Sequence, residues 1–399
     1  MIACGAQLAC LALEYGEDML AELRTLVHKI WRTMVSVETG VVLLILVGIL
    51  SAVGTIVLQR PVTRPDEMQS AYSPMVLRVL DAAGLTDVFH SWWFLGLVFL
   101  VSVCIVAASI DRLPSRWRYF SRPYKYPDER FRRANHPQRS LALASREAGE
   151  ESGLAAAERA LQSRGYNPER VAWQDHLGIF AEKHRISELA VYIVHSSLLL
   201  IFFGTIVDGL WGWRGTINLN EGQSSNIVEM RDGQTRALPF SIRCDAAGRE
   251  NYKDGTAKRL WSRLAVVKAG QDMQTKEIVV NDPLLYGGVR FYQSSYGANG
   301  HLTGLEVSHE PGQWWVWSGL ALLGVGLAFA FYLVHMRIWV VPVRDPKTGK
   351  PSLWIGGSAN RNRDGFEERF NDLAASIEKE LKRMTSSAPN AQLAMAADK

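Results

Sequence analysis

The chain has 399 residues, 48% of them hydrophobic, and a formal net charge of +4. So small a positive charge does not indicate a nucleic-acid partner, and the sequence has no nucleotide-binding motif of the kind an ATP-driven exporter needs. The length would suit two or three soluble domains, but the long apolar runs described next exclude a purely soluble protein.

Four apolar segments are long enough to cross a bilayer. Each has a core of roughly 18–22 residues without Asp, Glu, Lys or Arg, enough for about 30 Å of hydrocarbon. One such run could be a buried core helix, but four in one chain predict an integral membrane protein. The predicted transmembrane helices occupy residues 35–58, 92–110, 189–208 and 313–335.

The segment 111–140, directly after the second predicted span, indicates the orientation. It holds nine Arg or Lys residues against three acidic ones, which predicts a cytoplasmic side, close to anionic lipid headgroups. The leader 1–34 and the tail 336–399 are then cytoplasmic as well. The loop 59–91 and the segment 209–312 are extracytoplasmic. The leader shows no cleavable signal pattern, so we expect a multi-pass protein of the inner (cytoplasmic) membrane.

Residues 111–188 are expected to form a basic surface loop followed by a small α+β module. "RSLALAS" alternates like a strand, "RVAWQD" and "LGIFAEK" form a strand pair, and a helix lies between them. In that helix Leu154, Ala157, Ala160 and Leu161 share one face, and Gly165 ends it.

The segment 209–312 is predicted to be an all-β domain, either a sandwich or barrel-like. Its strands, such as "GTINLN", "FSIRCD", "SRLAVVKAG", "KEIVVND" and "GVRFYQSSY", are separated by Gly, Asn and Asp residues. The domain has no cluster of ligand residues, so we expect it to bind or position a partner.

The tail is predicted to contain a hairpin, "RIWVVPV" with "SLWIGG", and a helix over about 364–384 that packs on the α+β module. We expect residues 385–399 to be disordered. The helix has five apolar residues at helical spacing: Phe366, Phe370, Leu373, Ile377 and Leu381.

His195 is the strongest candidate for a functional residue, because it lies inside the uncharged run "LAVYIVHSSLLLIFFGTIV". An unsatisfied imidazole in hydrocarbon costs several kcal/mol. It can be an axial ligand to haem iron, for which an apolar slot suits the porphyrin. Alternatively, it is a packed residue hydrogen-bonded to Ser196, to Ser197 or to a neighbouring helix. The residues alone leave both interpretations open.

Two further histidines border the spans, His90 at the outer edge of the second and His335 at the cytoplasmic edge of the fourth. Both lie at interface depth, where an imidazole can simply be hydrated, so they are weaker candidates for haem contact. A single histidine within the spans supplies half of a bis-histidine site, so the other half must come from a second copy or a partner. The spans supply no acidic residues for a proton-coupled transporter.

Tryptophan is concentrated at the outward ends of the predicted spans. Seven of the thirteen Trp residues lie at these ends, either as an interfacial belt or as a shelf along the path of a planar cofactor: Trp92, Trp93, Trp211, Trp213, Trp314, Trp315 and Trp317.

The cysteines give no sign of a redox site. No CxxC occurs, which excludes a thioredoxin-type site. Cys104 and Cys244 are expected to be small, buried and inert. We predict no catalytic residue.

Several long stretches together resemble the ResB-type (Ccs-type) cytochrome c biogenesis proteins. They include "LSAVGTIVLQ", "FHSWWFLGLVFLVSVCIVAAS", "YIVHSSLLLIFFGTIVDGLWGWRGTINLNEGQ", "KEIVVNDPLLYGGVRFYQSSYG" and "GGSANRNRDGFEERF", in fixed order after the leader. The first span ends "GTIVLQ" where relatives often have Pro, which affects the exit of that span. Four spans with a large domain between the third and the fourth are also the arrangement of that family.

The resemblance implies a haem-handling subunit, non-catalytic or co-catalytic, of a holocytochrome c synthase (haem lyase). The transported substrate would be haem b, bound at a site shared with a ResC/CcsA-type membrane partner and delivered to the CxxCH motif of apocytochrome c. Thiol-reducing proteins would be further partners. His195 would be the axial ligand to the haem iron, with the opposing histidine supplied by the partner. The alternative is a membrane-anchored scaffold whose β domain docks redox partners without binding haem.

Overall fold

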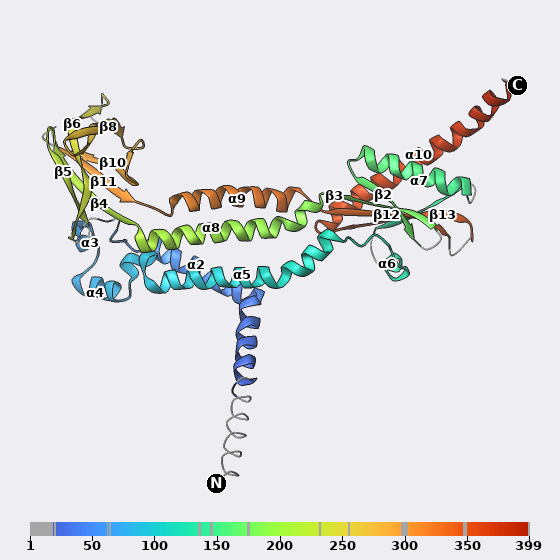
Figure 1. Cartoon of the computed structure of the whole chain (residues 1–399), viewed down its shortest axis with the longest axis horizontal. Coiled ribbons are helices and arrows are strands. Elements are labelled where there is room, and N and C mark those ends of the chain that lie inside the picture. Colours follow the sequence, from blue (N-terminus) through green and yellow to red (C-terminus); the bar gives the residue numbers. More distant parts are fainter. Residues whose placement is uncertain are drawn as a thin grey trace, which may run out of the picture. The chain divides into compact units, whose positions relative to one another are not determined.

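The structure is a computed structural model that describes residues 19, 21–61, 63, 65–134, 137–143, 147–173, 176–230, 233–253, 256–296, 302–345 and 349–397. The chain divides into two compact units (Figure 1). The first comprises residues 1–109 and 195–321, and the second comprises residues 110–194 and 322–399. Part of the predicted leader, residues 1–18 and 20, lies outside the described residues, while residues 21–35 are helical.

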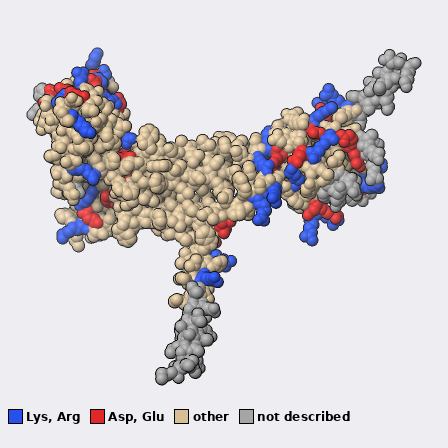
Figure 2. Space-filling view, in the orientation of Figure 1, with Lys and Arg blue, Asp and Glu red and all other residues tan. Residues whose placement is uncertain are grey.

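Four helices of the described chain are long and apolar enough to cross a membrane, which makes this a membrane protein with four apolar helices. They are α2 (Val37–Ile56), α5 (Trp92–Ser121), α8 (Ala190–Trp211) and α9 (Gln313–Tyr332). Along most of their length, the surface of these helices that faces the viewer in Figure 2 carries no charged residue. Ser36 caps α2 by accepting a hydrogen bond from the backbone N–H of Glu38.

Two helix ends differ from the prediction. α5 does not stop at residue 110 but continues to Ser121 through the basic segment, with Pro114 inside it. Arg is a good helix former, so loss of apolar character marks where a span leaves the membrane and not where its helix ends. α9 ends at Tyr332, and His335 therefore lies outside it.

The segment between α2 and α5, predicted as a loop, is largely helical. It forms α3 (Pro65–Ala71), α4 (Pro74–Ala82) and the 3₁₀-helix η1 (Leu85–His90). Ser73 caps α4, and Pro74 suits its first turn. The side chain of Gln59 fixes η1, since it donates to the Leu85 carbonyl at 3.0 Å and accepts from the Val88 N–H at 2.9 Å.

The first unit contains an eight-stranded antiparallel sheet in the order β8-β7-β6-β5-β4-β11-β10-β9 (Figure 1). The strands are β4 (Trp213–Asn220), β5 (Ser224–Met230), β6 (Thr235–Asn251), β7 (Ala257–Lys268), β8 (Gln271–Val279), β9 (Leu284–Tyr286), β10 (Val289–Tyr296) and β11 (Leu302–His309).

The two edge strands of this sheet are neighbours in sequence. Only residues 280–283 join β8 to β9, so the sheet curls and brings the end of β8 close to the start of β9. The inward-facing residues fill one core, with Leu219, Ile242, Leu264 and Leu305 completely buried. The prediction of an all-β segment is confirmed and its form is barrel-like, although β5, β9 and β11 were not among the strands that the sequence singled out.

The second unit is an α+β module around a five-stranded antiparallel sheet in the order β1-β13-β12-β3-β2. Its strands are β1 (Gln138–Ala142), β2 (Asn167–Trp173), β3 (His176–Lys183), β12 (Met336–Arg344) and β13 (Pro351–Ala359). Its helices are α6 (Glu129–Arg133), α7 (Glu147–Ser163), η2 (Arg185–Leu189) and α10 (Arg363–Ala397).

The predicted packing of the tail on this module is confirmed, and the tail goes further by completing the sheet. β13 pairs with β1, and β12 pairs with β3. Alternate strand residues face opposite sides. One face, with Ile338 and Leu353, packs against α7 and α10. The other face buries Trp339 and Phe180.

The predicted helix faces are also confirmed. All five apolar residues named for the tail helix and all four named for α7 are buried in one core. Gly165 has a φ of 74°, which suits its place after the end of α7. The prediction of disorder for 385–399 is wrong as far as Ala397, since α10 continues to that residue. Residues 398 and 399 lie outside the described residues.

Candidate functional site

His195 lies in the second turn of α8, about 7.5 Å along the helix axis from Ala190 at 1.5 Å per residue. The helix forms because residues 190–211 are almost entirely apolar and contain no Pro. A backbone with all its hydrogen bonds internal is also what a bilayer requires. The imidazole therefore projects from a rigid apolar helix.

One hydrogen-bond partner of His195 is Ser109 on α5. The Ser109 Oγ lies 2.9 Å from the His195 Nδ1, so a neighbouring helix holds the ring, whereas Ser196 is exposed and Ser197 fully buried. A hydrogen bond at one ring nitrogen fixes the orientation of an imidazole, and histidines that bind metals through the other nitrogen have such a bond. The contact is therefore compatible with both interpretations of His195.

The chain itself covers little of these helices. Only 17% of the apolar window that includes α8 is buried, and the corresponding share for α2 is 6%. α9 approaches α8 closely where Gly319 lies against the Ser197 carbonyl, because a Cβ at Gly319 would come within 2.9 Å of that oxygen. His195 itself is only partly buried. Lipid or another polypeptide must cover the rest.

The described residues fit haem better than a bare metal ion. They contain no group of three or more His, Cys, Asp or Glu side chains that could hold a metal ion. Porphyrin supplies four nitrogen ligands to iron, so haem asks a protein for only one or two axial groups. A single oriented imidazole on an apolar helix meets half of that need.

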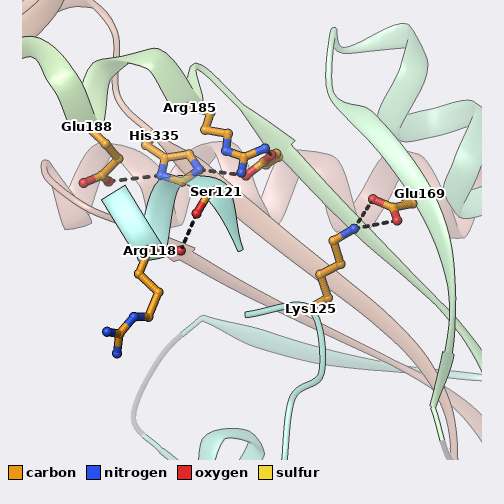
Figure 3. Close-up of polar contacts among 8 residues, drawn as sticks. Arg118, Ser121, Lys125, Glu169, Arg185, Glu188 and His335 are labelled. Carbon is orange, nitrogen blue, oxygen red and sulfur yellow. Dashed lines mark hydrogen bonds and ion pairs between the residues drawn. The ribbon is translucent and has the colours of Figure 1, made fainter. Parts of the chain in front are cut away.

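His335 is fully enclosed in a cluster of charged groups, with 1% of its surface exposed. Its Nδ1 lies 3.0 Å from the Glu188 Oε1 and its Nε2 lies 3.2 Å from the Glu182 Oε2 (Figure 3). Arg185 pairs with Glu182 at 3.0 Å, and Asn360 donates to Glu188 at 3.0 Å. The interpretation of His335 as a hydrated interfacial residue is wrong.

The two carboxylates keep His335 charged. Burial opposes that charge, but the hydrogen bonds to Glu182 and Glu188 outweigh it and raise the pKa of the imidazole. Carboxylates only accept hydrogen bonds, so both ring nitrogens must carry protons. Binding iron would require His335 to lose a proton and an ion pair, which argues against this residue as a haem ligand.

His90 lies at the end of η1, just before α5, and is exposed. Its Nδ1 lies 2.6 Å from the Asp87 Oδ1. The hydrogen bond to Asp87 raises the pKa of His90 against a smaller opposing effect of burial, and the charge of Asp208 acts in the same direction as Asp87. His90 therefore has an oriented ring and favours the protonated form.

The Trp residues at the span ends divide into two groups. Five are exposed: Trp92, Trp211, Trp314, Trp315 and Trp317. The other two are packed, Trp93 against a small core near the start of α5 and Trp213 against the β core, where its ring stacks on that of His309. The exposed rings suit an interfacial belt and an aromatic shelf equally well.

The cysteines fit the expectation. Cys104 and Cys244 are free and buried, and Cys4 and Cys10 lie outside the described residues. Burial raises the pKa of the Cys244 thiol to about 11, so at neutral pH it is protonated and a poor nucleophile.

Sequence reasoning missed two residues at the junction of α8, α9 and the β domain. Asp208 belongs to the last turn of α8 and accepts a hydrogen bond from the Gly312 N–H at 2.6 Å. His309 ends β11 and stacks on Trp213. The sequence signal for His309 is its position directly before the "EPGQWWVW" start of the fourth span.

Comparisons with known proteins identify relatives of this chain. The ResB-like family matches residues 37–303 and 299–371. The chain is 28% identical over 282 residues to "Cytochrome c biogenesis protein CcsB" of Synechococcus sp. (strain JA-3-3Ab), covering 67% of this chain but only 55% of that protein. It is 23% identical over 495 residues to the protein of the same name from Gloeobacter violaceus, covering 97% of this chain and 99% of the relative.

One solved structure, "Cytochrome c Heme Lyase CcmF", is similar at 10% identity and a TM-score of 0.30, covering 67% of this chain and 41% of that one. A TM-score this low supports no conclusion about fold or function.

Proposed function

Because the chain belongs to the ResB-like family, we propose that it is the haem-handling subunit of a cytochrome c maturation system. Its relatives from Synechococcus and Gloeobacter bear the name of cytochrome c biogenesis proteins. The proposed substrate is haem b, which passes through the membrane and is joined to the CxxCH cysteines of apocytochrome c. The subunit is non-catalytic or co-catalytic within the synthase.

The observation that carries the proposal is the imidazole of His195 on an apolar helix, held at Nδ1 by Ser109 at 2.9 Å. A neutral imidazole is a good axial ligand for haem iron, and apolar surroundings limit access of water and oxidant. Bound in this way, haem would have its iron in a defined ligation state while it waits for attachment. His195 would orient the haem, and Ser109 would orient His195.

A second membrane protein, of the ResC/CcsA type, is proposed to complete the site. This chain offers one histidine within its spans, and most of its apolar helix surface is uncovered. A partner that packs on α8 would supply the opposing histidine and exclude lipid from the porphyrin. Thiol-reducing proteins that keep the apocytochrome cysteines reduced are proposed as further partners.

The proposed topology follows from charge. The basic segment after α5 and the α+β module would be cytoplasmic, together with both termini, in the inner membrane. The barrel-like sheet between α8 and α9 would then be extracytoplasmic. There it would position the apocytochrome, contributing proximity and not bond-making groups.

A scaffold without haem is the competing function, favoured by the Ser109 hydrogen bond, which satisfies one nitrogen of His195 within the protein. Copurification of the chain with its partner, followed by absorbance at the haem Soret band, separates the two functions. The haem-handling function predicts that His195→Gly loses haem and that added imidazole restores it.

The matched control is His28→Ala, which removes an exposed histidine of the leader helix. It should retain the haem content of the unmodified chain. Equal haem in the His195→Gly and His28→Ala complexes would favour the scaffold and overturn the proposed role of His195.

A further inference from the structure

A separate helix, residues 21–35, precedes the first span and is called the leader helix here (dark blue in Figure 1). It is not a straight continuation of α2, because Ser36 between them has extended backbone and caps α2. The backbone N–H of Ser36 donates to the Thr33 carbonyl at 3.3 Å, in the last turn of the leader helix. The two helices can therefore take different directions.

The leader helix has one apolar and one polar face. At 3.6 residues per turn, its six large apolar side chains between residues 21 and 34 fall within about 140° of the circumference. The polar side chains occupy the rest. The apolar face consists of Leu23, Leu26, Val27, Ile30, Trp31 and Met34. The polar face consists of Glu22, Arg24, Thr25, His28, Lys29, Arg32 and Thr33.

The apolar face is uncovered within the described chain. Every residue from 21 to 33 is exposed, and the exposed fractions of Leu23, Val27 and Ile30 are 54%, 57% and 51%. A helix with such a stripe normally buries it against another surface, and a contiguous exposed apolar patch marks an interaction site. The leader helix thus has a face that needs an occupant.

The polar face is basic. Arg24, Lys29 and Arg32 stand against a single acid, Glu22. Within the described part of the chain, none of the three cations has an ion-pair partner. A basic face opposite an apolar one is the pattern of helices that lie on membranes with anionic lipids.

The connection to α2 brings the leader helix to a bilayer surface. Ser36 is the only residue between it and a helix apolar enough to cross the membrane. The leader helix is not a further span itself. At 1.5 Å per residue it is roughly 22 Å long, short of the hydrocarbon thickness of about 30 Å, and it contains charged residues in each of its turns.

We propose that the leader helix lies in the plane of the membrane. Its apolar face enters the boundary between headgroups and acyl chains, and Arg24, Lys29 and Arg32 contact the phosphates of anionic lipids. Trp31 lies at the edge of the apolar face, where an indole suits headgroup depth. In the topology proposed above, this is the cytoplasmic leaflet. The proposal does not depend on haem handling.

The test measures which reagents reach each face. The full-length chain carries Cys4→Ser and Cys10→Ser, its two remaining cysteines being buried. It receives one spin label at a time, at Leu23→Cys, Ile30→Cys or Thr25→Cys. Each protein is placed, one chain per disc, in nanodiscs of phosphatidylcholine and phosphatidylglycerol. Collisions with oxygen, which concentrates in lipid, and with a nickel chelate, which stays in water, are then compared.

Labels at Leu23 and Ile30 should have an oxygen-to-chelate ratio about tenfold higher than the label at Thr25, because only the apolar face meets acyl chains. Equal ratios on the two faces would overturn the proposal, since the helix would then be in water. Exclusion of both reagents from Leu23 and Ile30 would also overturn it, because protein and not lipid would cover the face.

A charge on each face provides a matched pair of variants. Ile30→Glu places a carboxylate where the acyl chains should be, which is costly without a partner, so the label at Leu23 should become accessible to the chelate. Thr25→Glu puts the same charge on the polar face and should leave that label protected. Protection that survives Ile30→Glu would show that the apolar face is not in the membrane.

The role of the cations has its own measurement. The spectrum of the label at Leu23 gives the ratio of docked to undocked helix, and an Ile30→Ala background weakens docking enough for this ratio to change. Joint replacement of Arg24, Lys29 and Arg32 by Gln should lower the ratio about fivefold per cation in anionic discs. It should leave the ratio unchanged in phosphatidylcholine alone, and Glu22→Gln should not lower it in either. An equal loss in both lipids would remove anionic lipid from the proposal.

Discussion

Replacement of His335 by alanine should destabilise the second unit strongly without removing haem. The variant removes the cation that Glu188 and Glu182 share. Both carboxylates are largely buried, since the Glu188 side chain is 6% exposed and the Glu182 side chain 15%. Loss of one partner of a buried ion pair costs about 3–5 kcal/mol. Glu182 keeps Arg185 at 3.0 Å, so we expect the lower end of that range, about 3 kcal/mol. For a unit of this size that is about 6–12 °C in Tm.

The stability conferred by His335 should also depend on pH. The pKa of His335 is raised in the folded chain, so its contribution is complete below the unfolded pKa of about 6.5 and is lost as pH rises through the folded pKa. The unmodified chain should therefore become less stable above neutral pH, and His335→Ala should lack this slope.

Thermal melts of the full chain in detergent, followed by circular dichroism, measure both effects. Hydrogen exchange in peptides of β12 locates the change, and His28→Ala is the control. A Tm and pH profile equal to those of the control would refute the ion-pair reasoning. Loss of haem from a folded His335→Ala complex would mean that the residue acts as a ligand after all.

Three other substitutions or probes test separate parts of the structure. Ser109→Ala removes the hydrogen bond to His195. In a hemin titration it should weaken haem binding about fivefold, which is the value of one net hydrogen bond. An unchanged affinity would mean that Ser109 does not orient the ring. Phe370→Ala removes a side chain that is 1% exposed in the core between α7 and α10. The cavity should lower the free energy of unfolding by about 3–5 kcal/mol and lower the Tm. The control Glu367→Ala, at an exposed position of the same helix, should not change the Tm. Cys244, with a pKa raised to about 11 by burial, should resist maleimide in the native chain at pH 7.5 and react after denaturation; rapid native labelling would contradict its burial.

The apolar pattern predicted most of the fold because each element repeats its signal many times. The faces of α7 and α10 and the four long apolar helices all follow from regular spacing. The end of α5 and the short helices α3 and α4 did not follow, since charged residues continue a helix as readily as they end one. A single cap, Ser73, begins α4, and the side chain of Gln59 bonds to the backbone of η1. Single residues of this kind leave too short a signal to be recognised in a sequence.

The sequence singled out His195 as the candidate residue, and its role stays a prediction, but the sequence did not indicate the contacts of that residue. His195 stood out because an imidazole is rare in an apolar run, yet Ser109 lies 86 residues away along the chain and no spacing rule links the two. His335 was misjudged for the same reason. Its carboxylate partners come from β3 and η2, and only the pairing of β12 with β3 brings them together.

The partners of the four histidines sort them by chemistry. Two carboxylates around His335 require protons on both ring nitrogens, which leaves no lone pair for iron. One carboxylate beside His90 raises its pKa and favours the charged ring. A carbonyl beside His309 fixes the proton on Nδ1, and the hydroxyl of Ser109 can donate to or accept from His195. Since only a neutral imidazole binds iron, the hydrogen-bond partners favour His195 over His335 and His90, and this ranking does not depend on how close each residue lies to a span.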